Sequence, residues 1–168
     1  MMPNLNKSIV VVTCTSLLLF FSFFSPASAG PIDSVPEKSH CPVCGMFVAK
    51  YPDWIAEIVS ETDTYFFDGV KDMLVYYFTP EQFNGPPREE LKEIWVKDYY
   101  SLKWINGNTA YYVYGSDVYG PMGHELIPFS SIEAAESFKT DHKGKKILRF
   151  EEITPGLIES MRHGQRMR

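Results

Sequence analysis

The stretch WIAEIVSETDTYFFDGVKDMLVYYF, residues 54–78, indicates the fold class because its hydrophobic period changes partway along. Residues 54–59 and 64–67 are rich in β-branched and aromatic side chains, and the polar residues 60–63 between them predict a short antiparallel hairpin. Four apolar residues then recur at the spacing of one helix face, namely Val70, Met73, Leu74 and Tyr77. Two strands followed by a helix predict an α+β fold.

The predicted helix has a clear start and a clear end. Asp68 precedes it, and a carboxylate at that position accepts hydrogen bonds from the free amides of the first turn. We therefore interpret Asp68 as a helix cap rather than as a functional acid. Thr79-Pro80 ends the helix, because proline lacks an amide hydrogen and cannot continue the helical hydrogen bonds.

From residue 91 onward the chain repeats this order in outline. Asn106-Gly107 predicts a tight turn between extended segments at 104–105 and 110–114. The other elements that we predict are a strand at 93–99, a glycine-rich loop at 115–123, a serine-capped helix at 130–138, a strand at 146–150 and a helix at 155–162. We therefore predict an α+β protein of two small ββα-type units with antiparallel strands, at residues 41–90 and 91–163.

The N-terminal residues 1–29 are typical of a secretory signal peptide. Lys7 precedes a largely apolar run at 9–24, and Ala27-Ser28-Ala29 matches the small-x-small pattern of a cleavage site. The run is short for a bilayer span, which needs about 20 apolar residues. We expect a cleaved, periplasmic product, attached to a membrane only if the segment is retained. Cys14 lies within the run and leaves with it.

The mature chain is acidic and has no enzyme motif. Loss of Lys7 leaves 15 basic and 21 acidic residues, a net charge of −6. Such a charge argues against nucleic acid as a partner. The sequence has neither a phosphate-binding loop nor a nucleophile–base arrangement, so we predict that the protein is not an enzyme. Residues 30–40 contain two prolines and predict a flexible linker, and residues 164–168 predict a basic tail.

The remaining two cysteines, Cys41 and Cys44, lie in the stretch HCPVCGM at residues 40–46. Their thiols and the thioether of Met46 form a cluster of soft ligands, which selects Cu(I), zinc or an iron–sulfur cluster over hard cations. A two-residue spacing allows both thiols to face one ion. We interpret the pair as metal ligands, whereas Met46 fits a ligand and a core residue equally well.

Two other interpretations of the cysteine pair stay open. A disulfide is permitted outside the cytoplasm, but one between Cys41 and Cys44 closes too small a loop to stabilise the fold much. A thioredoxin-like redox pair needs a helix start that lowers the pKa of a thiol, and Gly45 and Pro52 leave no room for such a helix. A structural zinc site would use Cys41, Cys44, His124 and another histidine, without the methionines.

A second group of candidate ligands lies far downstream, in Met122-Gly123-His124. Glycine and proline flank it, so core packing does not explain the methionine. A thioether and an imidazole suit Cu(I), and a thioether is a poor ligand for zinc. We predict that the fold brings this group to the cysteines. The remaining histidines, His40, His142 and His163, are interpreted as linker or solvent-exposed residues.

These motifs resemble the NosL family of copper-binding proteins, which combine a Cys-Gly-Met near the start with a later Met-Gly followed by Pro-Phe. Here they read Cys44-Gly45-Met46 and Met122-Gly123, with Pro128-Phe129 after them. The resemblance covers roughly residues 40–150. It implies a periplasmic Cu(I) metallochaperone for the copper centres of nitrous oxide reductase, with a copper donor and that client enzyme as partners. It also implies two ββα-type halves, similar in topology to a domain of organomercurial lyase.

The sequence departs from the family pattern at its N-terminus. Many members are lipoproteins that are anchored through an acylated cysteine, whereas Cys14 lacks a lipoprotein cleavage pattern and Cys41 adds a thiol. Membrane attachment is therefore not expected, and Cys41 replaces a ligand that others take from the lipidated cysteine. The predicted Cu(I) ligands are Cys41, Cys44, Met46, Met122 and His124.

Overall fold

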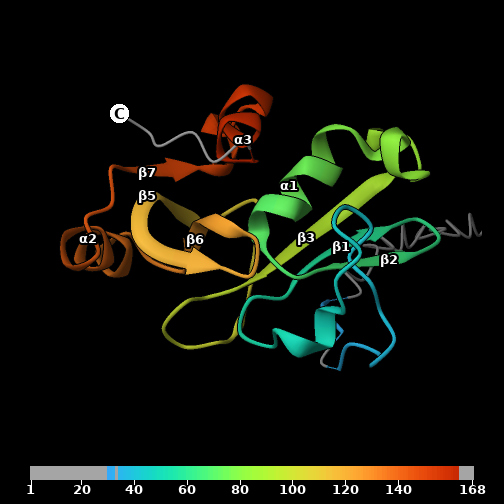
Figure 1. Cartoon of the computed structure of the whole chain (residues 1–168), viewed down its shortest axis with the longest axis horizontal. Coiled ribbons are helices and arrows are strands. Elements are labelled where there is room, and N and C mark those ends of the chain that lie inside the picture. The colour runs from blue at the N-terminus through green and yellow to red at the C-terminus, as the bar shows by residue number, and fades with distance from the viewer. Residues whose placement is uncertain (1–29, 33, 163–168) are drawn as a thin grey trace, which may run out of the picture.

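The computed structural model describes residues 30–32 and 34–162, which form three α-helices and two antiparallel sheets. Figure 1 shows helix α1 (Val70–Phe78) in the centre of the molecule, between the two sheets. The predicted α+β class with antiparallel strands is confirmed. The predicted signal peptide, residues 1–29, and the tail, residues 164–168, lie outside the described residues.

The first sheet has the strand order β2-β1-β3-β4. Strands β1 (Ala56–Ser60) and β2 (Thr64–Phe67) form the hairpin expected from the polar residues between them, with Ala56 opposite Phe67. Strand β3 (Leu91–Lys97) pairs with the other edge of β1, and the short β4 (Trp104–Asn106) pairs with β3. The sheet therefore takes strands from both sides of residue 90, where the sequence suggested a boundary between two units.

Helix α1 covers the residues predicted for it, but the prediction that Asp68 caps it is wrong. Its N-cap is Gly69, which has no side chain to cap the helix, and the Asp68 carboxylate accepts from Sγ of Cys44. The amide of Lys71 instead donates to Oε1 of Glu125, at 2.6 Å, from the second sheet. A carboxylate does satisfy the helix start, but it comes from 54 residues downstream, where helix-capping patterns cannot reveal it.

The second sheet has the order β6-β5-β7. Strand β5 (Tyr111–Gly120) pairs with β6 (Gly123–Phe129) on one side and with β7 (Lys146–Arg149) on the other. The glycine-rich loop predicted at 115–123 is mostly strand: the two strands continue to Gly120 opposite Gly123, past an irregularity between Tyr114 and Tyr119. Only Pro121 and Met122 remain at the tip of this hairpin.

The turn at Asn106-Gly107 exists, but the hairpin predicted around it does not. The segment before it belongs to the first sheet and the segment after it to the second, so this turn is where the chain passes between sheets. The Gly107 carbonyl accepts a hydrogen bond from the buried hydroxyl of Tyr112 at 2.7 Å. A Cβ at Gly107 would lie 2.5 Å from Cγ2 of Ile94, so the close packing of the chain explains the glycine.

The remaining helices cover the second sheet and α1. Helix α2 (Ile132–Asp141) begins at Ser131, whose hydroxyl accepts from the amide of Ala134 at 3.2 Å, and this confirms the predicted serine cap. Helix α3 (Pro155–Arg162) lies where it was predicted and packs beside α1 (Figure 1). Within the described residues, no helix has the length and apolar character needed to cross a membrane.

One large hydrophobic core joins the two sheets. It includes residues from both sheets and from helices α1 and α3, among them Ile58, Phe67, Leu74, Ile94, Tyr112, Leu126 and Ile158. A smaller cluster lies between α2 and the second sheet and contains Val113, Ile127, Phe129, Ala135 and Phe138. The shared core fixes α1 and the second sheet relative to each other, and this relation positions the candidate site.

Candidate metal site

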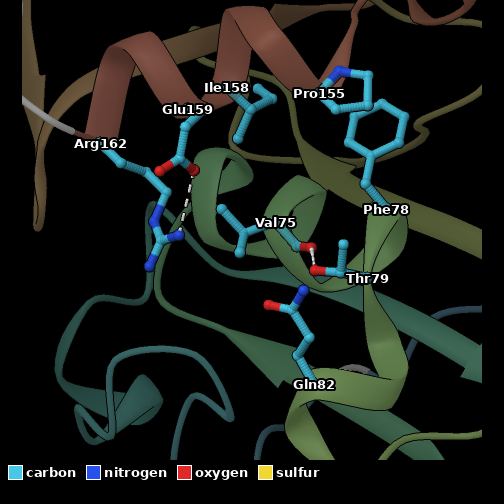
Figure 2. A pocket seen from close by; sticks show the side chains of 8 residues that line it. All are labelled: Val75, Phe78, Thr79, Gln82, Pro155, Ile158, Glu159 and Arg162. Atoms are coloured by element: carbon cyan, nitrogen blue, oxygen red, sulfur yellow. Dashed lines mark hydrogen bonds and ion pairs between the residues drawn. The ribbon is translucent and has the colours of Figure 1, made fainter.

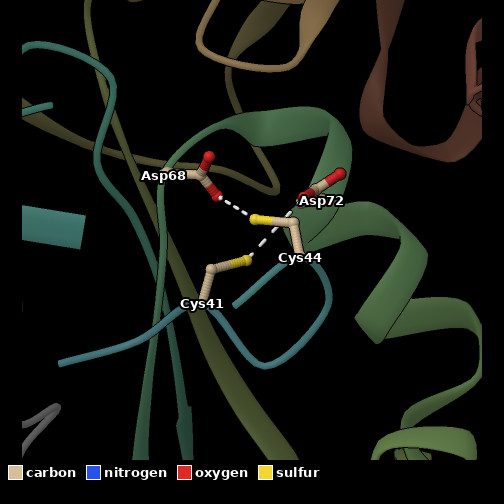
Figure 3. A group of neighbouring side chains, drawn as sticks. All are labelled: Cys41, Cys44, Asp68 and Asp72. Carbon is tan, nitrogen blue, oxygen red and sulfur yellow. Dashed lines mark hydrogen bonds between the residues drawn. The ribbon is translucent and has the colours of Figure 1, made fainter. Parts of the chain in front are cut away.

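The two cysteines lie on a tight loop that opens the folded part of the chain. His40 and Phe47 form a β-bridge at its base. Within the loop the Cys41 amide donates to the Met46 carbonyl at 2.9 Å, and the Gly45 amide donates to the Cys41 carbonyl at 2.8 Å. Gly45 has a φ of +77°, a left-handed conformation that favours glycine. The loop thereby turns both thiols toward the start of α1 (Figure 3).

Two carboxylates from the start of α1 face these thiols. Sγ of Cys44 donates to Oδ1 of Asp68 at 3.2 Å, and Sγ of Cys41 lies 3.8 Å from Oδ2 of Asp72 (Figure 3). One ligand atom from each of the four side chains lies within 4.8 Å of the other three. Asp68 lies just before the N-cap Gly69 and Asp72 lies in the first turn of α1, so both carboxylates stand at the start of this helix. This pair was missed in the sequence, although the spacing was a usable signal.

The four-residue cluster is largely shielded from water. Cys41 and Asp68 are each 1% exposed and Asp72 is 4% exposed, whereas Cys44 is partly exposed. Burial raises the pKa of Cys41 to about 12, and burial and the bond to Asp68 raise that of Cys44 further. Burial also raises the pKa of the Asp72 carboxyl. Without an ion, therefore, the thiols are protonated and donate to the carboxylates.

Backbone amides of the loop oppose this effect. The amides of Cys44 and Val43 donate to the sulfur of Cys41, and the amide of Met46 donates to the sulfur of Cys44; each lowers the pKa of the thiol it contacts. Amide donors stabilise a thiolate because they supply positive partial charge. The net pKa of both thiols stays raised, but the same amides would stabilise the thiolates if a metal ion replaced the protons.

A cavity of about 310 Å³ leads from the surface to Cys44. It is lined by Val43, Cys44, Lys71, Asp72, Met122 and Arg162. The fold therefore does bring Met122, 78 residues downstream, to the same cavity as a thiol. Met122 is 44% exposed, so its thioether is available at the rim.

The other two candidates lie differently. His124 pairs with Tyr119 across the β5–β6 hairpin, with ring centroids 4.8 Å apart, and it is absent from the residues that line the cavity. Met46 is half-buried and contacts Cys41 through its backbone carbonyl. The His124 ring is not among the clustered thiols and carboxylates.

The donor set fits a metal ion of soft or borderline character. Two thiolates and a thioether are preferred by Cu(I), whereas two thiolates and two carboxylates also form a four-coordinate set suited to zinc. Asp68 Oδ2 is buried and has no hydrogen-bond partner within the described part of the chain. A buried carboxylate oxygen without a partner is uncommon, and a bound cation would satisfy it.

A second hollow, between α1 and α3, offers no such set (Figure 2). Its volume is about 120 Å³, and its walls include the apolar side chains of Val75, Phe78 and Ile158. Its charged residues, Glu159 and Arg162, lie 3.3 Å apart and pair with each other. Arg162 borders both hollows, so the two open on adjoining parts of the surface.

Comparison with known proteins finds a matching family model and two related proteins. A family model described as NosL matches residues 31–158. The chain is 30% identical to the copper-binding lipoprotein NosL of Stutzerimonas stutzeri over 139 residues, which covers 76% of this chain and 70% of that protein. It is also 30% identical to the protein of the same description from Achromobacter cycloclastes, over 142 residues, 76% of this chain and 69% of that one.

A solved structure agrees with these relatives. The crystal structure of the copper chaperone NosL from Shewanella denitrificans superimposes with a TM-score of 0.65 and 26% sequence identity. The match covers 75% of this chain and 97% of that one. The fold described above is thus similar to nearly the whole of a solved copper chaperone.

Proposed function

Because this chain belongs to the NosL family, we propose that it is a periplasmic metallochaperone that binds Cu(I) and delivers it to a copper enzyme. The observation that carries the proposal is the convergence of two thiols and two carboxylates within 4.8 Å, beside a cavity with Met122 at its rim. Membership of the NosL family indicates copper as the metal, and the cavity offers a route by which the ion can enter and leave the site.

Copper binding at this site exchanges the protons of the thiols for the metal ion. Each thiol that forms a Cu–S bond releases its proton to a carboxylate or to water, and the ion keeps its oxidation state. Cys41 and Cys44 are the proposed primary ligands, with Met122 as a thioether ligand from the rim. Asp68 and Asp72 take up protons or bind the ion directly. Met46 and His124 stay candidate ligands that require the loop and the hairpin to adjust.

Delivery requires ligand exchange, in which a ligand of the receiving protein replaces one ligand of the chaperone at a time. Cys44 and Met122 border the cavity, whereas Cys41 is buried. Exchange therefore begins at Cys44 and Met122, and Cys41 holds the ion until last. The proposed client is nitrous oxide reductase, and a copper donor loads the site. No step makes or breaks a covalent bond of a substrate, so the protein acts as a carrier and not as an enzyme.

The test is an anaerobic Cu(I) titration of the reduced mature protein against a chromophoric chelator. Wild type is compared with Cys41→Ser/Cys44→Ser, Met122→Ala, His124→Ala and Met46→Ala. We expect tight binding that the double serine variant loses and Met122→Ala weakens. Unchanged affinity in the double serine variant would overturn the proposal. Transfer from the loaded protein to copper-free nitrous oxide reductase, followed by gel filtration and metal analysis, tests the client.

A structural zinc site is the second candidate, and the carboxylates favour it. Asp68 and Asp72 complete a set of four ligands with the thiols, and carboxylate oxygen binds zinc well. In that case zinc would raise the midpoint of thermal unfolding more than Cu(I) does, and Met122→Ala would leave metal affinity unchanged. A thiol–disulfide redox role has less support, because burial raises the pKa of both thiols, whereas a reactive cysteine needs a lowered one.

The envelope location is tested separately. The relatives from Stutzerimonas stutzeri and Achromobacter cycloclastes are described as lipoproteins. We propose a soluble periplasmic product cleaved after Ala29. Mass spectrometry of the protein from a periplasmic extract is expected to give a chain that starts at Gly30, without an acyl group. Recovery of an acylated chain from the membrane fraction would instead show a lipid anchor.

A further inference from the structure

Lys71 is almost completely buried, which is uncommon for a lysine and calls for a structural explanation. It lies in the first turn of α1 and is 3% exposed, whereas lysine is rarely buried without a partner. Its ammonium donates a hydrogen bond to the backbone carbonyl of Met122. Its own amide donates to the Glu125 carboxylate. Backbone and side chain of one residue therefore both bind the β5–β6 hairpin.

The end of that hairpin is shaped around this contact. Oε1 of Glu125 accepts from the amides of Lys71, at 2.6 Å, and Leu126, at 2.9 Å. A Cβ at Gly69 would lie 2.4 Å from Oε2 of Glu125, and one at Gly120 would lie 3.1 Å from its Cγ. The two glycines leave room for the Glu125 side chain, which in turn fixes the hairpin against the start of α1.

The contact also sets where Met122 lies. Met122 occupies the two-residue tip of the hairpin, and loop tips are ordinarily among the most mobile parts of a fold. Lys71 and Met122 line the same cavity as Cys44 and Asp72. Since Asp72 follows Lys71 directly, a single turn of α1 carries both a carboxylate of the cluster and the donor that holds the hairpin tip.

We propose that Lys71 is a positioning residue that holds Met122 over the thiols, so that the thioether is presented to copper without having to be ordered first. This inference rests on the proposed function, because it assigns Lys71 to the same site. Lys71 does not itself bind the ion. Its ammonium fixes the backbone of the residue whose side chain does.

A different role for Lys71 predicts a different result. Its positive charge lies near Asp72 and could favour metal binding by stabilising the negatively charged ligands instead. A charge effect would persist when the thioether is absent, whereas a positioning effect would vanish. A double-mutant cycle between Lys71 and Met122 separates the two.

We would measure Cu(I) dissociation constants for wild type, Lys71→Leu, Met122→Ala and the double variant, by competition with a chelator under anaerobic conditions. Loss of a residue that orients a metal ligand typically costs about 10- to 100-fold in affinity, and we expect this loss in Lys71→Leu. The double variant should bind no more weakly than Met122→Ala. Lys71→Arg, which keeps the donors, should bind close to wild type, and Lys103→Leu, at an exposed lysine, serves as the control. Equal losses from Lys71→Leu in both backgrounds would overturn the proposal.

A second readout needs no copper. In protein labelled with ¹³C at the methionine methyl groups, the Met122 signal is identified by its loss in Met122→Ala. In the metal-free protein this signal should sharpen and move toward the random-coil position in Lys71→Leu, but not in Lys103→Leu. If Lys71→Leu does not fold, Lys71→Gln, which is polar but too short to reach the carbonyl, replaces it. An unchanged Met122 signal refutes positioning by Lys71, even if wild type fails to bind copper and the proposed function falls.

Discussion

At the scale of single residues, Asp68 connects the thiol loop to the start of α1. Its Oδ1 accepts from Cys44, and its buried Oδ2 has no hydrogen-bond partner within the described ranges 30–32 and 34–162. Asp68→Asn keeps the shape but removes the charge, and we expect it to weaken Cu(I) binding by about 10- to 100-fold. The exposed Asp53→Asn is the matched control in the same chelator competition. Equal affinity in both variants would exclude Asp68 from the site.

Glu125 gives the metal-free protein a characteristic dependence on pH. Burial raises its pKa from 4.5 to about 8. In the unfolded chain it ionises near 4.5, so its contribution to stability is complete below pH 4.5 and is lost as pH rises through 8. In urea unfolding from pH 4.5 to 9, wild type should therefore lose stability relative to Glu125→Gln. The exposed Glu81→Gln should run parallel to wild type, and a Glu125→Gln curve that also runs parallel would contradict the assigned shift.

The candidate site residues could be named from the sequence where their chemistry alone marks them as candidates. Cys41, Cys44 and Met122 carry sulfur, and their neighbours exclude a simple core role for Met122. Asp68 was misread because an acid before a helix is usually its cap. Only the folding of residues 41–44 over the start of α1 shows that its carboxylate faces a thiol, and no local pattern records that contact.

At the scale of elements, Asp98 ties the end of β3 to the second sheet. Its Oδ1 accepts from the amide and hydroxyl of Ser101, both at 2.8 Å, and its Oδ2 accepts from the amide of Ser130 at 2.7 Å. Burial alone would raise the pKa of Asp98, but these donors lower it below its usual value. Asp98 therefore joins the β3–β4 connection to the residue that follows β6.

Removal of this tie should destabilise the protein. Hydrogen bonds to a charged group contribute about 1.5–3 kcal/mol each, so we expect Asp98→Ala to lower the free energy of unfolding by about 3 kcal/mol or more at pH 7. Because the folded-state pKa is lowered, the contribution is present above pH 3.8 and is lost as pH falls through the folded value. Urea unfolding at pH 7 and pH 3 checks both statements. A loss as large at pH 3 as at pH 7 would argue against a charged Asp98.

Local elements were predicted well where one signal governed them. The period of Val70 to Tyr77 placed α1, and Ser131 marked the start of α2. The segment 115–123 was misread because glycine usually interrupts a strand, whereas here the strand irregularity accommodates Gly115 at a φ of +79°. The Asn106-Gly107 turn was found, but a turn signal does not state which strands it joins.

At the scale of the whole molecule, the shared core predicts a single unfolding transition. Ile58 of the first sheet, Leu74 of α1 and Leu126 of the second sheet belong to one buried cluster. Neither sheet has a large core of its own, so loss of one exposes the other. Far-UV circular dichroism and tryptophan fluorescence should give coincident urea curves for the metal-free protein. Two separated transitions would mean that the sheets unfold independently.

Bound copper should raise the free energy of unfolding while the protein still unfolds in a single transition. At a free Cu(I) concentration 100 times the dissociation constant, linkage adds about 2.7 kcal/mol to the free energy of unfolding. The addition should disappear in Cys41→Ser/Cys44→Ser and after treatment with an excess of chelator. A stabilisation that survives in the double serine variant would place the copper elsewhere.

Long-range pairing was the part of the fold that the sequence did not disclose. The order of strands and helices suggested two units in succession, whereas β3 returns to pair with β1 in the first sheet. Such a pairing joins residues more than 30 positions apart and leaves no periodic trace in either segment. The same limit applies to the contact between Lys71 and Met122, which depends on how the two sheets meet.

The unequal exposure of the two thiols also makes the protein a convenient reagent. In the reduced, metal-free state a bulky maleimide can reach Cys44 at the cavity, while Cys41, at 1% exposure, is covered by the fold. Because burial and Asp68 raise the pKa of Cys44, labelling is expected to be slow and to need prolonged incubation, but the single dye that attaches should lie at Cys44. A fluorophore on Cys44 would report directly on molecules that approach the cavity, so the unequal exposure of the two thiols would also provide a sensor for metal ions and partner proteins.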